Sequence, residues 1–428
     1  MSFFVVQNYN RLLKLLGGFF VLFAVQTVHA ASVTIACGAS GSDVVNCQKY
    51  ANDWAKKTGH TVKFYSPPNS STEALALYRQ LFAAKSADVD VLVMDIIWPG
   101  ILKDHLLDLK PRAASEIEQH FPAIIANNTV EGRLLGLPWY TDAGLLYFRK
   151  DLLDKHKQKV PGTWEELLSV AKAILAAEKA AGNTELQGYV FQAKAYEGLS
   201  CNALEWVASF GGGSVVDGSG KVTVNNPMAA KALNFAASMV GEISPKGVLN
   251  YAEEDARGVF QSGKAIFMRN WPYAFALSQK GDSAVVGKVG VAPLPKVAGA
   301  AKGAAALGGW NMAVSKYSKA PDAAIDLALH MTSSAVQKAR ALEGSFNPTR
   351  PALYQDKDVI AGNFLMANLS GVLANASPRP TTVTGLKYPE VSQAFWDATH
   401  DVLSKKSTGE DAVKKLESKL NQIKRSKW

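Results

Sequence analysis

Residues 32–94 read SVTIACGASGSDVVNCQKYANDWAKKTGHTVKFYSPPNSSTEALALYRQLFAAKSADVDVLVM, and their pattern decides the fold class. Three short runs are apolar or alternate between apolar and polar residues, which is typical of strands; they are residues 32–36, 61–65 and 90–94. Helical patterns separate these runs at residues 44–56 and 73–84. Strands that alternate with helices form a parallel sheet with helices on its faces, so the stretch predicts an α/β fold.

The same alternation returns further along the chain and predicts a second α/β lobe. Strands and helices are expected in turn at residues 145–148, 164–181, 189–191, 204–210 and 228–241. A chain of 428 residues, 48% of them hydrophobic, suits two lobes better than one large sheet. Helices resume at residues 322–342. A last amphipathic helix, predicted to dock on the surface of the fold, carries one apolar stripe: Ala412, Val413, Leu416, Leu420 and Ile423.

Residues 1–30 are predicted to be a signal peptide and not part of the fold. Arg11 and Lys14 precede the uncharged apolar run LLGGFFVLFAV at residues 15–25, and small side chains precede a cleavage site before Ala31. The run has 11 residues, whereas a membrane-spanning helix needs about 20. We therefore expect a mature chain of residues 31–428 that is exported across the inner membrane to the periplasm.

The net charge of +9 does not indicate a nucleic-acid partner. The first 30 residues hold two basic and no acidic residues, so the mature chain carries +7. No block of five or six basic residues occurs, and the densest basic stretch is residues 424–427 (KRSK). Nucleic-acid binding is therefore not expected.

The three cysteines suit an oxidising compartment. Cys37 and Cys47, ten residues apart, are the predicted disulfide, which leaves Cys201 as a single thiol. Lipidation of Cys37 is the competing interpretation, because the small residue Ala36 precedes it. A disulfide would connect the turn after the first strand to the following helix.

Most catalytic and cofactor signatures are absent from the sequence. The seven histidines are scattered, with no two at helical spacing, and neither a G-x-S-x-G run nor a G-x-x-x-x-G-K-[ST] run occurs. No metal and no cofactor are expected. A pair of carboxylates that hydrolyses a glycosidic bond cannot be seen in a sequence, so a secreted glycoside hydrolase stays open as an alternative.

Four segments place an aromatic side chain beside a polar or glycine residue where an expected strand or turn ends. They are residues 94–98 (MDIIW), 139–144 (WYTDAG), 269–273 (RNWPY) and 307–311 (LGGWN). A sugar needs this mixture, because its C–H face lies on an aromatic ring while its hydroxyls bind carboxylates and arginine. Ligands of open α/β sheets bind beyond the carboxyl ends of strands. The segments therefore predict a sugar site, against the alternative that each ring packs in the core.

Several runs closely resemble the extracellular solute-binding proteins, family 1, of carbohydrate ABC importers. They are residues 137–151 (LPWYTDAGLLYFRKD), 269–274 (RNWPYA), 288–295 (KVGVAPLP) and 307–310 (LGGW). The similarity runs through the mature chain in the same order and includes residues 196–199 (YEGL) and 378–380 (PRP). Within this family the chain looks most like the trehalose/maltose-binding branch.

The resemblance implies a two-lobe α/β clamp with three interlobe crossovers. The N-terminal lobe would comprise residues 31–140 and 305–350, and the C-terminal lobe residues 141–304 and 351–428. Such a monomer would hold a di- or oligosaccharide in the cleft without chemical change and deliver it to the transmembrane permease subunits of the importer. The residues that match the family's binding positions are Asp43, Asp95, Tyr140, Asp142, Trp271, Tyr273, Gly309, Trp310 and Arg379.

Two departures from the family pattern fall in the N-terminal lobe. Relatives often carry an arginine in the helix after T-E, where this chain reads TEALAL at residues 72–77; the contact is missing or comes from elsewhere, with Arg79 as a candidate. Asp43 is one methylene shorter than the glutamate that relatives can have. We expect any shift in specificity at the sugar ring held by this lobe.

A binding protein for a non-sugar solute, such as a polyol phosphate or a peptide, is the remaining alternative. A phosphate would require several basic groups, whereas the matched positions provide one arginine, three carboxylates and aromatic rings. This composition favours a neutral sugar.

Overall fold

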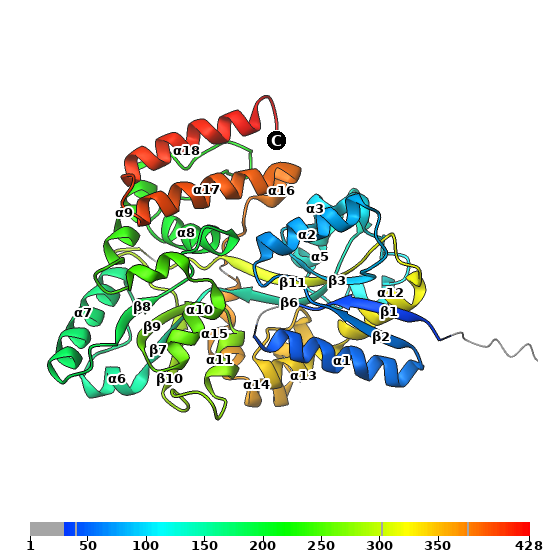
Figure 1. The fold of residues 1–428 in the computed structure, drawn as a ribbon, viewed down its shortest axis with the longest axis horizontal. Coiled ribbons are helices and arrows are strands. Elements are labelled where there is room, and N and C mark those ends of the chain that lie inside the picture. Colours follow the sequence, from blue (N-terminus) through cyan, green and yellow to red (C-terminus); the bar gives the residue numbers. More distant parts are fainter. Residues whose placement is uncertain (1–29, 39–40, 301–302, 375) are drawn as a thin grey trace, which may run out of the picture.

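The computed structural model describes residues 30–38, 41–300, 303–374 and 376–428 (Figure 1). The predicted signal peptide lies outside the described residues, except for Ala30. Among the helices of the described part, none has both the length and the apolar character needed to span a membrane.

The first sheet contains five strands. In spatial order they are β2 (Thr61–Tyr65), β1 (Ser32–Ala36), β3 (Val91–Asp95), β11 (Leu307–Val314) and β6 (Leu137–Ala143). β1 runs parallel to both β2 and β3, which confirms the pairing expected from the strand–helix alternation. β11 is antiparallel to β3 and β6, so the purely parallel sheet predicted from the sequence is wrong for these strands. The reason is that β11 enters from the other lobe and runs in the opposite direction.

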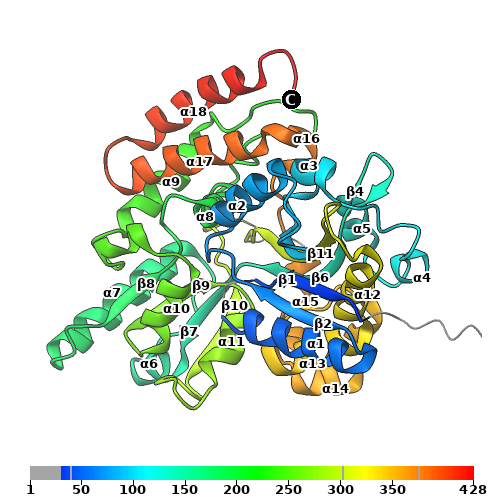
Figure 2. The ribbon, with the colours of Figure 1, turned by 45° about the vertical axis from the view of Figure 1, so that its right-hand side comes forward.

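The second sheet contains four strands and is also mixed. In spatial order they are β10 (Val289–Pro293), β7 (Leu145–Arg149), β9 (Ala265–Asn270) and β8 (Gln187–Val190). β7 is antiparallel to β10 and β9, whereas β8 and β9 are parallel. A short ribbon pairs β4 (Thr129–Val130) with β5 (Arg133–Leu134). In Figures 1 and 2 the two large sheets occupy separate halves of the molecule.

Helices cover both faces of the first sheet. They are α1 (Ser42–Thr58), α2 (Ser71–Ala83), α3 (Pro99–Leu102), α4 (Ala114–Ile117), α5 (Pro122–Asn128), α12 (Pro321–Met331) and α13 (Ser334–Gly344). Alternate residues of β3 show the two faces, because Val91 and Val93 belong to the core under α1 and α12, and Leu92 and Met94 to the core under α2. The helical region expected at 322–342 is divided at Ser333, whose side chain caps α13.

The remaining helices include those that pack on the second sheet. They are α6 (Lys150–Lys155), α7 (Trp164–Ala180), α8 (Glu197–Ser209), α9 (Pro227–Met239), α10 (Glu253–Gln261), α11 (Tyr273–Ser278), α14 (Lys357–Gly362), α15 (Phe364–Ala374), α16 (Thr381–Thr384), α17 (Tyr388–Leu403) and α18 (Gly409–Lys424). Short 3₁₀ turns are η1 (Lys103–His105), η2 (Lys246–Asn250), η3 (Pro351–Tyr354) and η4 (Gly385–Lys387). The predicted apolar stripe of α18 is buried, and the helix packs on α9 and α17, as expected for a docked helix.

The chain passes between the two sheets in both directions at the middle of the molecule. β6 stays in the first sheet through Ala143, so Gly144 alone separates it from β7 of the second sheet. On the return path β10 leads to β11, and Ala306, directly before β11, forms a parallel bridge with Ser377. These segments lie side by side and bring the ends of β6, β7 and β11 to the middle of the molecule.

Candidate functional site

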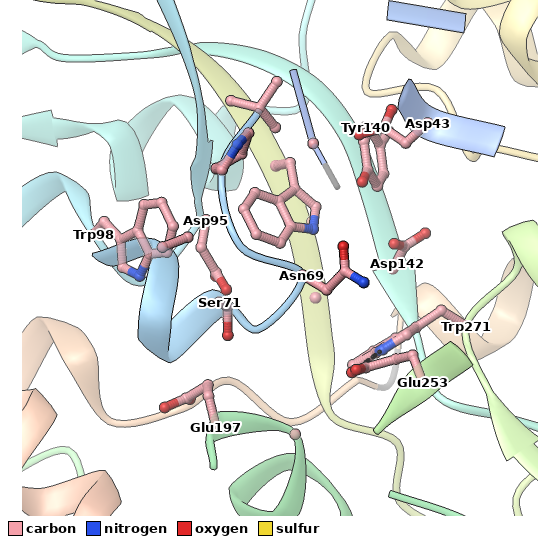
Figure 3. A pocket seen from close by; sticks show the side chains of 18 of the residues that line it. Asp43, Asn69, Ser71, Asp95, Trp98, Tyr140, Asp142, Glu197, Glu253 and Trp271 are labelled. Carbon is pink, nitrogen blue, oxygen red and sulfur yellow. Dashed lines mark hydrogen bonds between the residues drawn. The ribbon is translucent and has the colours of Figure 1, made fainter. Parts of the chain in front are cut away.

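A cavity lies between the two sheets and encloses about 910 Å³ of space between protein atoms, including solvent at its mouth (Figure 3). All nine residues that the sequence singled out as candidate ligand contacts line it: Asp43, Asp95, Tyr140, Asp142, Trp271, Tyr273, Gly309, Trp310 and Arg379. They come from segments more than 300 residues apart in the chain, and the fold therefore places them around one space.

Three neighbouring strands of the first sheet position four of these side chains. Tyr140 and Asp142 are two residues apart on β6 and point to the same face. Trp310 on β11 pairs with Tyr140 of β6 on one side and with Asp95 of β3 on the other, so the three residues lie in one row across the sheet. A Cβ on Gly309 would lie 2.7 Å from the carbonyl oxygen of Tyr140, and its φ of 140° also requires glycine.

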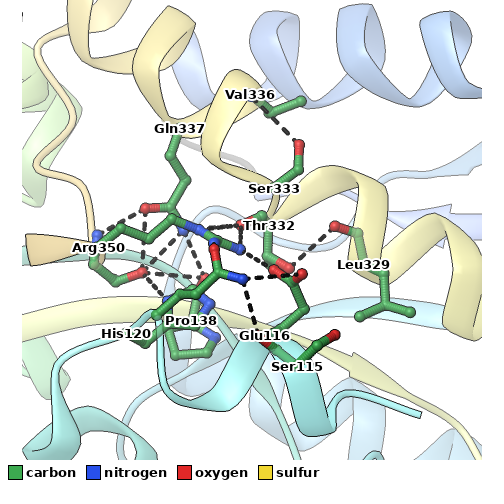
Figure 4. A network of polar contacts seen from close by, with 12 residues as sticks. Ser115, Glu116, His120, Pro138, Leu329, Thr332, Ser333, Val336, Gln337 and Arg350 are labelled. Carbon is green, nitrogen blue, oxygen red and sulfur yellow. Dashed lines mark hydrogen bonds and ion pairs between the residues drawn. The ribbon is translucent and has the colours of Figure 1, made fainter. Parts of the chain in front are cut away.

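A polar network anchors the strand that carries Tyr140 and Asp142 (Figure 4). The Gln337 side chain donates to the Pro138 carbonyl at 3.0 Å and to Thr349 Oγ1 at 2.9 Å. Arg350 donates to the carbonyl of Thr332 and pairs with Glu116. These bonds join the start of β6 to the corner between α12 and α13, and they fix the strand behind the cavity.

Asp43 is buried and held by donors from the first lobe. Arg340 Nη2 donates to its Oδ1 at 2.5 Å, and Trp139 Nε1 donates to the same oxygen at 3.3 Å. Burial raises the pKa of Asp43, and the nearby Arg340, Trp139 and Tyr140 offset part of this rise. The guanidinium of Arg340 lies 3.6 Å from the ring centroid of Trp139, so an aromatic wall supports the pair.

Asp95 uses only one of its oxygens within the protein. Oδ1 accepts from the backbone N–H of Ile97 and from Arg379 Nη2, each at 3.2 Å. Burial raises its pKa to about 6, Arg379 opposes the rise, and the like charge of Glu197 adds to it. No hydrogen bond from the described residues reaches Oδ2, and Asp95 lines the cavity.

Asp142 has the least compensation of the three aspartates. It is 5% exposed, and its Oδ1 has no hydrogen-bond partner among the described residues. Burial raises its pKa from the ordinary 3.8 to about 7; Arg340 and Arg269 oppose the rise, and Asp43 adds to it. A buried carboxyl without a donor indicates a group that is completed by a ligand hydroxyl.

Two glutamates of the second lobe also line the cavity and were missed by sequence reasoning. Glu197 accepts from Arg379 Nη1 at 2.9 Å and from the hydroxyls of Tyr388 and Ser392. Glu253 accepts from Tyr196 and from the indole N–H of Trp271. Both glutamates have protein donors on both carboxylate oxygens, so they orient neighbouring side chains. Glu197 lies in the YEGL run, but nothing in that run indicates these partners.

Aromatic rings from both lobes line the cavity. The indole of Trp271 follows β9, and Tyr273, whose hydroxyl donates to Glu254 Oε1 at 2.6 Å, begins α11. Trp310 stands edge-on to Trp98, with ring centroids 5.5 Å apart. Trp98 lies in the MDIIW segment but was not among the predicted site residues; it lines the cavity and is 1% exposed.

The structure also locates the two departures from the family pattern. Arg79 is exposed on α2 and is not among the residues that line the cavity, so it does not supply the missing contact. Ser71, Ala74 and Tyr78 line the cavity on this helix. Cys37, which also lines the cavity, forms a disulfide with Cys47, and Asp43 lies within the loop that this bond closes.

The two sheets, the short segments that join them and the cavity between them define a two-lobe solute-binding protein. The family model described as bacterial extracellular solute-binding protein matches residues 41–338. The chain belongs to this family.

Named relatives and solved structures agree with this assignment. A "Probable ABC transporter-binding protein" of Deinococcus radiodurans is 50% identical over 407 residues, 95% of this chain and 96% of that protein. The maltose-bound MalE3 structure of T. maritima has a TM-score of 0.87 and 40% identity, and the match covers 92% of this chain and 100% of that chain. A "Mannitol-binding protein" of Pseudomonas aeruginosa is 27% identical over 279 residues, 64% of this chain and 62% of that protein.

Proposed function

We propose that the protein is the sugar-binding subunit of an ABC importer and that it captures a disaccharide of the maltose or trehalose type in the cavity. The observation that carries this proposal is the combination of carboxyl groups and aromatic rings around one cavity. Asp95 and Asp142 line it, and Oδ1 of Asp142 has no donor among the described residues, while Trp310 of the first lobe and Trp271 and Tyr273 of the second lobe present rings. A sugar has hydroxyls for the first set and a C–H face for the second.

The charges around the cavity support a neutral solute. Its lining carries five carboxylates and one arginine: Asp43, Asp95, Asp142, Glu197, Glu253 and Arg379. Arg379 is already paired with Asp95 and Glu197, so it is not free to bind a phosphate. A polyol phosphate or another anion would meet an excess of like charge.

The relatives support the same solute class. The protein solved as T. maritima MalE3 is bound to maltose, and it shares 40% identity over nearly the whole chain. In the proposed cycle the sugar contacts both lobes only when they are closed, and it stabilises closure by that difference in contacts. The closed monomer, secreted to the periplasm, then delivers the sugar to the permease subunits.

Isothermal titration of residues 31–428, refolded to remove retained solute, tests the proposal. The panel is maltose, trehalose, sucrose, glucose and mannitol, with chromatography of each mixture to detect products. Micromolar or tighter binding of one disaccharide without product supports an importer subunit. Binding of mannitol alone would replace the disaccharide by a polyol, and cleavage of a disaccharide would replace the binding protein by a glycoside hydrolase. No binding across the panel refutes the proposal.

A further inference from the structure

A buried ion pair lies beneath the ring of Trp271. Arg269 on β9 and Glu205 on α8 form a two-pronged contact, Nε to Oε2 at 2.9 Å and Nη2 to Oε1 at 2.5 Å. Their side chains are 1% and 2% exposed. Gln192 accepts a hydrogen bond from Arg269 Nη1 at 3.1 Å. Each of the three guanidinium nitrogens therefore donates a hydrogen bond within the protein.

The same pair contacts two of the segments that join the lobes. The backbone N–H of Ala306, directly before β11, donates to Glu205 Oε1 at 3.0 Å. Gly144, the single residue between β6 and β7, passes so close that a Cβ there would lie 2.1 Å from Glu205 Oε1 and 2.7 Å from Arg269 Nη2. The ion pair therefore packs against the path of the chain in both directions between the lobes.

The pair also supports the aromatic side of the cavity. The Arg269 guanidinium carbon lies 3.9 Å from the centroid of the Trp271 ring. The indole N–H donates to Glu253 at 3.3 Å, and Gly308 of the first sheet is close enough that a Cβ there would lie 2.9 Å from the ring. Trp271 is therefore held at its back by the cation, at its N–H by Glu253 and at its edge by β11.

We propose that Glu205 and Arg269 are positioning residues that fix the Trp271 ring relative to the segments joining the lobes. The guanidinium of Arg269 stacks on the Trp271 ring, and the carboxylate of Glu205 accepts a hydrogen bond from the Ala306 N–H. Loss of the charge on Glu205 would weaken its two-pronged contact with the Arg269 guanidinium. The Trp271 ring and the start of β11 would then no longer be held by the same ion pair. The effect on affinity, though not the effect on the ring, rests on the proposed sugar-binding function.

The test compares three variants by ¹⁹F NMR of protein labelled with 5-fluorotryptophan, with the Trp271 resonance assigned by its loss in Trp271→Phe. Glu205→Gln keeps the shape of the side chain, Arg269→Lys keeps the positive charge but not the fork, and Gly144→Ala pushes a methyl group into the pair. The matched control is Arg149→Gln, which breaks a two-pronged pair with Asp151 in the same sheet, away from Trp271.

We expect the Trp271 resonance to shift or broaden in all three variants and to stay in place in the control. We also expect maltose to bind the three variants at least tenfold more weakly, with control affinity unchanged. An unperturbed Trp271 resonance in folded Glu205→Gln and Arg269→Lys overturns the proposal. If Glu205→Gln does not fold, the other two variants give the same readout. Failure of the parent protein to bind any sugar of the panel counts against the proposed function alone, because the resonance does not depend on sugar.

Discussion

Replacing Asp142 by asparagine is expected to make the ligand-free protein more stable and to weaken sugar binding. The folded protein raises the pKa of this carboxyl from 3.8 to about 7, because burial penalises the charged form. Between these two pH values the folded state holds a proton that the unfolded state has lost. Stability therefore falls as the pH rises through this window, and above pH 7 the accumulated cost is about 4 kcal/mol.

The asparagine variant removes the charge but leaves a buried polar group without a partner. Such a group costs about 1–3 kcal/mol, but the neutral carboxyl of the parent carries the same cost, so the net gain at pH 8 is expected to be about 4 kcal/mol. At pH 4 the aspartate is neutral in the folded protein, and the gain should disappear. For sugar binding, exchange of a charged acceptor for a neutral one should weaken affinity by tenfold or more, about 1.4 kcal/mol.

Urea denaturation of the ligand-free protein at pH 4, 6 and 8 measures the first effect, and calorimetry with maltose at pH 8 measures the second. Asp88→Asn, at an exposed aspartate on the same lobe, is the control and should change neither. If Asp142→Asn is no more stable than the parent at pH 8, or if its advantage is the same at pH 4, burial of this charge does not carry the cost. Unchanged maltose affinity would remove Asp142 from the site.

Three further variants test the geometry of the first lobe. Trp310→Ala should weaken maltose binding by tenfold or more in calorimetry, with an unchanged circular-dichroism spectrum; equal affinity would show that the ring only fills space. Cys37→Ser with Cys47→Ser should lower the free energy of unfolding by roughly 3 kcal/mol, as expected for a loop of ten residues. The double variant should also bind sugar more weakly, because Asp43 is no longer held in that loop. A loss of stability with unchanged affinity would show that the disulfide does not position Asp43 for binding. Gly309→Ala should lower the free energy of unfolding by about 2 kcal/mol or more, because its Cβ would meet the Tyr140 carbonyl at 2.7 Å; a melting temperature equal to the parent's contradicts this packing.

Local patterns predicted those parts of the fold that local forces determine. The strands that became β1, β2 and β3 alternate with helices in the sequence, and their parallel pairing follows from that order. The direction of β11 could not be predicted, because it depends on the end from which the chain re-enters the first sheet. The start of α8 was also missed. Its N-cap is Tyr196, which provides no capping side chain, and Gly198 in the first turn is a weak helix former.

In the candidate site, too, residues with a local sequence signal could be predicted and residues placed by tertiary packing could not. Tyr140, Asp142 and Trp310 could be selected because their segments place an aromatic side chain beside a polar or glycine residue and match the family's binding positions. Arg340 could not, since it reaches Asp43 from 297 residues away and lies in an ordinary helix. Partners of this kind are determined by tertiary packing alone, and no local signal distinguishes them from a surface arginine.

The buried charges around the cavity differ in their partners, because Asp43 is paired with Arg340 whereas Asp142 has no donor among the described residues. In the second lobe Glu205, Glu253 and Arg269 are paired within the protein, and their effect is to orient the ring of Trp271. In the first lobe Asp142 is left without a donor, at a cost in stability. A neutral asparagine at this position would destabilise the folded state less, but an ionised carboxylate accepts the stronger hydrogen bond from a hydroxyl. The first lobe therefore contributes this carboxyl and the ring of Trp310, the second lobe contributes the ring of Trp271, and a sugar contacts both lobes only when they close on it.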